Sequence, residues 1–226
     1  MSYTVDDLID QFRTQMDDNV EPYLWEEDRI VEWIDEAQKI FAEKTHIFKG
    51  SESISVLAVD GGDFAMPAYV AETRRAILAS SAQPLIVGNF NAIDRASVYS
   101  DYGIDLYGDW ESLTGTPRLL VLDEKHGYGR LVPKPPADDT IKIHYYRYPL
   151  KDITQSSSKL ELTDTRHQRL LVVYARAMAY GDHDADVYDP RAEAAKMDEF
   201  HTKVDNITAQ ISRQTRRAGV VKYGGL

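Results

Sequence analysis

The sequence contains no cysteine among its 226 residues. This absence excludes disulfide bonds, thiolate metal sites and cysteine nucleophiles, and it fits a protein that is made and assembled in a reducing cytoplasm. Long apolar runs are also missing, since the stretch 170–175 ends at Arg176 and the residues after Met1 are polar and acidic. We therefore expect no signal peptide, no membrane helix and no membrane partner.

Familiar catalytic motifs are missing as well. The sequence has no HExxH, GxSxG, P-loop or GxGxxG pattern, and its six histidines are scattered. With 37 carboxylates, some acid pair must approach in any fold, so such a pair says little without an observed separation. We expect a protein that is not an enzyme and needs no cofactor.

The acidic stretch 182–193 is the strongest candidate for a metal site. Asp182, Asp184, Asp186 and Glu193 fall on positions one, three, five and twelve of a calcium-binding loop. The sixth position of such a loop needs glycine for a sharp turn, but here it holds Val187, which resists positive φ. We therefore favour a solvated turn between two helices and predict no metal site.

Charge is distributed unevenly along the chain. The formal net charge of −11 argues against a protein that binds nucleic acid through phosphate contacts. Residues 1–45 hold 13 acids and four bases, whereas the residues after Asp205 include no acid and four bases. Those bases are Arg213, Arg216, Arg217 and Lys222. The chain thus has an acidic beginning and a basic end.

Apolar periodicity predicts helices at both ends of the chain. The strongest pattern covers residues 25–45. Its inner stripe is Ile30, Ile34, Ala37 and Phe41. Thr4 is expected to cap an earlier helix that ends near Met16, and caps at 164–165 and at Asp189-Pro190 predict two later helices.

Between these helical regions the spacing of apolar residues changes to the alternation that is typical of strands. Short strand candidates lie at 53–56, 85–87, 119–122 and 140–148, while 72–80 is ambiguous. The predicted fold class is α+β, a helical bundle built from the N- and C-terminal helices with an inserted β-rich domain. The expected boundaries are 1–50 with 160–213 for the discontinuous bundle, 51–159 for the insert and 214–226 for an extended tail.

Two segments are candidates for contacts with partners. Aromatic residues at 99, 102, 107 and 110 lie in an acidic, glycine-punctuated stretch. Such a stretch suits a loop that contacts sugar or protein, or one that covers the open face of a small β domain. The C-terminal segment mixes its bases with apolar side chains, which suits either a segment that orders on a partner or a frayed, soluble end.

An ordered set of short matches resembles the head-tail adaptor proteins of tailed bacteriophages, especially short-tailed ones. The set begins with Pro22-Tyr23-Leu24-Trp25 and the stretch 30–38. It continues through Trp110, 115–119, 130–135, 145–149 and 174–177. The sequence departs from the family pattern at Glu26, where the family commonly has a serine-like cap, so the long helix is expected to begin less crisply.

The resemblance implies a helical bundle that carries a β domain and forms a twelve-membered ring beneath the portal. Such a ring continues the DNA channel toward the tail nozzle or tube protein, and the C-terminal segment docks on the portal. The uneven distribution of charge along the chain agrees with a ring. Head-to-tail contacts in a ring join two different surfaces of one protomer, and opposite charges favour such contacts. An acidic wall also suits DNA that must slide through without sticking. We expect a structural protein of the virion neck that assembles from monomers on the portal.

The resemblance and the charge pattern together assign two sets of contact residues. The expected portal-binding residues are Arg213, Arg216, Arg217, Val220, Val221, Lys222, Tyr223 and Leu226. The expected ring or partner contacts are Glu32, Trp33, Glu36, Glu43, Tyr102, Tyr107 and Trp110. Two alternatives stay open from the sequence: a host-surface glycan-binding module that uses the aromatic stretch 99–110, and a cell-wall glycan hydrolase that uses an acid pair.

Overall fold

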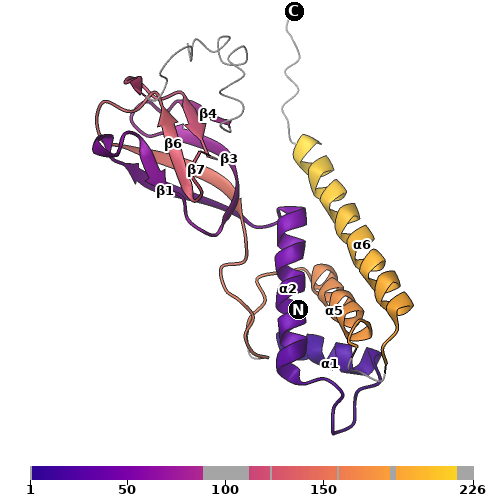
Figure 1. Ribbon diagram of the computed structural model, residues 1–226. Helices are drawn as coiled ribbons and strands as arrows, with labels where there is room; N and C mark the ends of the chain where they lie inside the picture. The colour runs from indigo at the N-terminus through magenta and orange to yellow at the C-terminus, as the bar shows by residue number, and fades with distance from the viewer. Residues whose placement is uncertain (1, 89–111, 123, 157, 184–186, 218–226) are drawn as a thin grey trace, which may run out of the picture. The chain divides into compact units, whose positions relative to one another are not determined.

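The computed structural model describes residues 2–88, 112–122, 124–156, 158–183 and 187–217. Contacts divide the chain into two compact units. One consists of Met1–Ile47 and Pro149–Leu226, and the other of Phe48–Tyr148. The described part of the chain holds seven strands and four α-helices (Figure 1).

The unit Phe48–Tyr148 is built on one seven-stranded sheet with the order β1-β7-β3-β4-β5-β6-β2. Neighbouring strands are antiparallel except β4 and β5, which are parallel. The strands at the two edges, β1 and β2, also contact each other, so the sheet is nearly closed. The elements are β1 Lys49–Val56, the 3₁₀ turn η1 Ala58–Asp60, β2 Asp63–Ala65, β3 Val70–Leu78, β4 Pro84–Gly88, β5 Leu119–Val121, β6 Tyr128–Val132 and β7 Asp139–Arg147.

Side chains from alternate positions of the strands fill the inside of this sheet. On β7 the inward positions are Ile141, Ile143 and Tyr145, which are all buried. The ring of Tyr145 lies over Gly50 of the paired strand β1, where an added Cβ would stand 2.6 Å from the ring. The alternation that marks 53–56 and 140–148 as strands is therefore confirmed, and it sets which face of each strand is buried.

The expected fold, a helical bundle with an inserted β-rich domain, is wrong. The chain is organised on a nearly closed, mixed seven-stranded sheet, with helices contributed by the two ends of the chain. Local periodicity reveals neither the short strands β2 and β6 nor the pairing of β1 with β7 across more than 80 residues. These two strands and this pairing complete the sheet. Without them the sequence predicts only a β-rich insert between helices.

The other unit contains α1 Val5–Gln15, α2 Glu27–Thr45, α5 Thr165–Tyr180 and α6 Pro190–Arg217. Side-chain caps fix three of the helix starts. Thr4 and Asp7 form a capping box at α1, Asp164 accepts from the amide of Arg166, and Asp189 accepts from two amides of α6. The predicted helix starts are thus confirmed, and α2 begins after Glu26 without a side-chain cap.

Helix α5 packs against α1, α2 and α6 (Figure 1). Its buried residues are Gln168, Leu170, Leu171, Val172, Tyr174, Ala175, Ala177 and Ala179. This set covers more of the helix than a single apolar face, as expected for a helix surrounded by others. On α2 the predicted inner stripe is confirmed, because Ile30, Ile34, Ala37 and Phe41 are all 0% exposed.

Gln168 joins three separate segments of this unit. Its side-chain oxygen accepts a hydrogen bond from the amide of Tyr3 at 2.9 Å. Its side-chain nitrogen donates to the carbonyl of Leu162 at 2.5 Å and to the hydroxyl of Ser2 at 2.7 Å. Gln168 is itself 0% exposed, and its bond to Leu162 is buried, where an unpaired amide is costly.

We predict that Gln168→Ala lowers the free energy of unfolding by about 2–4 kcal/mol, because it leaves buried partners unpaired and opens a cavity. Urea unfolding followed by the fluorescence of Trp25 and Trp33, which both lie in this unit, measures the change. Gln210→Ala, at an exposed position of α6, is the matched control. Equal stability of the two variants would contradict the role assigned to Gln168.

Candidate functional site

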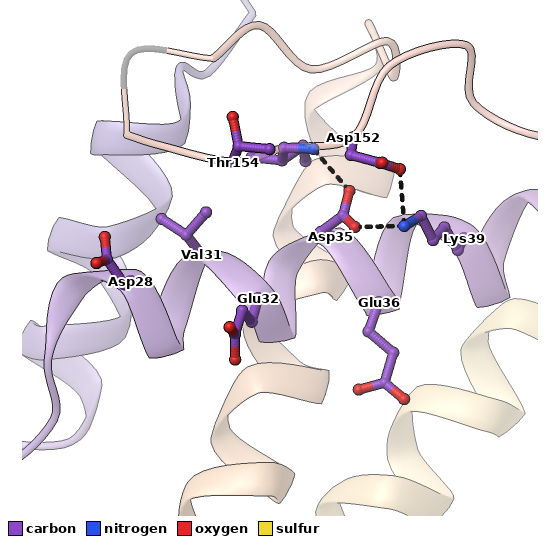
Figure 2. Close-up of a pocket in the computed structure, with 9 residues that line it drawn as sticks. Asp28, Val31, Glu32, Asp35, Glu36, Lys39, Asp152 and Thr154 are labelled. Carbon is purple, nitrogen blue, oxygen red and sulfur yellow. Dashed lines mark hydrogen bonds and ion pairs between the residues drawn. The ribbon is translucent and has the colours of Figure 1, made fainter.

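An acidic groove runs along α2 beside the segment that leads from the sheet into α5. The groove has a volume of about 530 Å³ (Figure 2). Its lining contains five carboxylates and one ammonium group. The lining residues are Asp28, Val31, Glu32, Asp35, Glu36, Lys39, Asp152, Ile153 and Thr154. The groove follows from the amphipathic pattern of α2, which turns its apolar residues inward and leaves its acids on the outer side.

Asp35 anchors the segment 152–154 to α2. One carboxylate oxygen accepts from the amide of Ile153 at 2.8 Å, and the other lies 2.7 Å from the ammonium of Lys39 (Figure 2). Ile153 and Asp35 are both buried, so this backbone bond is shielded from water. The returning chain is thereby held against the middle of α2.

Lys39 carries the only positive charge in the groove lining, and it is already engaged. Its ammonium lies 2.8 Å from the carboxylate of Asp152 as well as beside Asp35. Hydrogen bonds to Asp152 and then to Asp35 raise the pKa of Lys39 above its usual value. The carboxylates of Asp28 and Glu32 are exposed and lie outside these two ion pairs.

Glu36 points away from Asp35 in Figure 2, toward the neighbouring helices. Burial raises the pKa of the Tyr174 hydroxyl, and the charge of Glu36 and its hydrogen bond raise it further. The Tyr174 ring packs on Phe200 with 5.1 Å between ring centroids. Glu36 is thus an exposed residue that also ties α2 to the core between α5 and α6.

The other two contact candidates on α2 differ in exposure. Glu43 is exposed near the end of the helix, beyond the groove. Trp33 is only 6% exposed, and its ring lies 6.1 Å from that of Phe12 on α1. The indole therefore packs within the helical unit and offers little surface to a partner.

The connection between α1 and α2 is a second ordered surface. Asp18 forms a buried ion pair with Arg13 at 2.7 Å and accepts from the amide of Leu24 at 2.7 Å. Arg13 also donates to the carbonyl of Trp25 and stacks over the ring of Tyr23. The sequence shows this stretch as a connection and, at 22–25, as part of the family resemblance, but neither the pairing nor the stacking follows from residue spacing.

At the C-terminal end, α6 continues past the last turn of α2. The hydroxyl of Thr208 donates to the carbonyl of Lys44 at 3.2 Å, which places these two residues side by side. Arg213 is exposed five residues later. The helix backbone reaches Arg217, while the side chains of 214–217 and the whole of 218–226 lie outside the described part of the chain.

Several predicted residues fall outside the described ranges. These are the aromatic stretch with Tyr99, Tyr102, Tyr107 and Trp110, and the tail residues Val220, Val221, Lys222, Tyr223 and Leu226. The glycan-binding alternative depends on that aromatic stretch and stays a prediction.

The described residues of the acidic stretch 182–193 take part in an ion pair and in a helix cap. Asp182 pairs with Arg29 at 3.3 Å, and Asp189 caps α6. Asp184 and Asp186 lie outside the described ranges. Within those ranges, no three histidine or acidic side chains are grouped so that they could hold a metal ion. No helix in the described part of the chain is long and apolar enough to cross a membrane.

We predict that Asp35→Ala loosens the segment 149–156 and lowers the free energy of unfolding by about 1–3 kcal/mol, because the buried amide of Ile153 loses its acceptor. Hydrogen exchange at Ile153 measures the loosening directly. Glu32→Ala removes an exposed carboxylate from the same groove and serves as the control. Unchanged protection of Ile153 in Asp35→Ala would refute the anchor.

Comparison with known proteins assigns the chain to a family. The family model named SU10 adaptor protein matches residues 3–222, a range that includes every α-helix and strand in the described part of the chain. A search of the curated proteins finds no match. Because the family match covers nearly the whole chain, the protein belongs to the SU10 adaptor protein family and is a bacteriophage adaptor protein.

Proposed function

We propose that this protein is a structural component of the neck of a short-tailed phage virion, where it joins the portal to the tail. Twelve copies form a ring that continues the DNA channel, retains packaged DNA and passes it during ejection. The protein has no catalytic role in this proposal. The observation that carries it is the family match over residues 3–222.

The charges of the helical unit support an arrangement in a ring. A head-to-tail contact brings two different surfaces of one protomer together, and opposite charges on them favour the correct register. This chain carries open carboxylates along α2 and bases at the end of α6. A net charge of −11 also suits a channel through which DNA slides without sequence-specific binding.

The geometry of α6 supports docking of the C-terminal segment on the portal. The helix runs to Arg217, nine residues past Thr208, which hydrogen-bonds the last turn of α2, so its basic end lies beyond that end of α2. In the proposal, Arg213 and the residues that follow bind the portal. They add both charge and apolar side chains to that contact.

We predict that the purified protein forms a ring complex when it is mixed with the portal of its phage, visible by negative-stain microscopy. Truncation before Arg213 should abolish the complex and leave heads without tails, because the docking segment is missing. Arg191→Ala removes an exposed base from the opposite end of α6 and should assemble normally. Fully tailed virions from the truncated protein, with no ring on the portal, would overturn the proposed function.

We also predict that the protein alone is a monomer by light scattering. In the proposal the ring forms only on the portal, and this dependence on a template prevents premature polymers. Adding portal should shift the mass to that of the ring complex. A stable ring formed by the purified chain without portal would contradict assembly on a template.

A further inference from the structure

The loop between α1 and α2 holds apolar side chains out in solvent. Val20 is 77% exposed, Leu24 is 45% exposed and Tyr23 is 43% exposed. We call these three residues the apolar tip. The two nearest aromatic residues outside the tip, Phe12 and Trp25, are almost fully buried. Their rings therefore add nothing to the exposed apolar surface of the tip.

The apolar tip is held in one shape by contacts beneath it. The buried ion pair of Arg13 with Asp18 closes the loop, and Asp18 fixes the amide of Leu24. The guanidinium of Arg13 lies 3.8 Å from the centre of the Tyr23 ring. The rings of Phe12 and Trp25 meet edge to face below the loop, 5.5 Å apart. A surface ordered in advance loses little conformational entropy on binding, which favours affinity.

Burying an ion pair is energetically unfavourable, and a loop that only connects two helices does not need one. Taking Arg13 and Asp18 out of water costs free energy that their attraction only partly returns. The pair does not bury the apolar side chains at the tip, which stay exposed. An ordered surface with exposed apolar side chains is instead typical of an interaction site.

The surroundings of the tip define the chemistry of its partner. Between Thr14 and Asp28 the sequence has no lysine or arginine. The exposed acids around the tip are Asp17, Glu21, Glu26, Glu27 and Asp28. A complementary surface must offer an apolar pocket with lysine or arginine side chains at its rim.

The tip and the basic end of α6 lie at opposite ends of the helical unit (Figure 1). The loop leads directly into the first turn of α2, whereas Thr208 of α6 lies beside Lys44 in the last turn of α2. The 19 residues of α2 separate these points by about 28 Å, and Arg213 lies further beyond. The two ends are therefore separate surfaces of the helical unit.

We propose that the apolar tip docks into a basic-rimmed apolar pocket on the tail component next to this protein in the virion. This inference rests on the proposed function, in which the end of α6 faces the portal. Val20 and Leu24 fill the pocket, Tyr23 packs at its edge, and the acids of the loop face the basic rim.

The test adds purified protein to an extract from an infection that lacks this protein, and counts tailed heads by electron microscopy. Val20→Ser with Leu24→Ser should bind heads as well as the wild type but reduce the tailed fraction at least tenfold. Leu57→Ser with Val59→Ser removes two exposed apolar side chains from the other unit and should tail normally. Val20→Ile with Leu24→Met keeps the apolar tip and should also tail normally.

The outcomes separate this inference from the proposed function. Normal tailing by the Val20→Ser, Leu24→Ser protein would overturn the docking role of the tip. Heads that fail to retain this variant while they retain the wild type would also overturn it, since the tip would then contact the portal or a second copy. Failure of the wild-type protein to bind heads at all would instead overturn the proposed function. Thermal unfolding of each variant confirms that the fold is kept.

Discussion

Helix α5 buries residues on more than one face, and the other three described helices of its unit pack against it. Leu171, Ala175 and Ala177 have no exposed surface, and Tyr174 is nearly enclosed as well. A helix of this kind is not stable in water and needs partners on several sides. Those partners come from both ends of the chain, because α1 and α2 precede the sheet and α6 follows α5. Gln168 adds a polar link between α5 and the start of the chain.

The outer surfaces of the unit follow from this inward packing. Because Ile30, Ile34 and Phe41 of α2 face the core, the acids of α2 occupy the other side of the helix. Lys39 neutralises part of this charge, but it is already bound by Asp35 and Asp152. One helix therefore serves two purposes with two faces. Its apolar face packs in the core of the helical unit, and its acidic face lines the groove.

The sequence predicts local features of this protein well and long-range ones poorly. Caps at Thr4 and Asp189, and the apolar stripe that contains Ile34, are visible because they depend on residues a few positions apart. Local patterns do not predict the nearly closed sheet, because the pairing of β1 with β7 depends on residues more than 80 positions apart.

The same limit applies to the candidate site. The spacing of Asp35 and Lys39 along α2 is readable from the sequence, because residues four apart lie on one face of a helix. The arrival of Asp152 and Ile153 at that position depends on how the chain leaves the sheet, which no local pattern encodes. The burial of the Arg13 and Asp18 pair is hidden for a similar reason, since it depends on Phe12, Tyr23 and Trp25 closing over it.

The length of α6 determines both how far its end extends and the direction in which that end points. From Asp189 to Arg217 the backbone is a single helix, so each added residue lengthens it by about 1.5 Å and also turns its end by about 100°. An insertion of one residue would move the basic end only slightly outward but would aim it at a different side. An insertion of seven residues would nearly restore the original direction while moving the end about one nanometre further out. The helix therefore sets an angular register between the protomer's core and whatever its last turns contact.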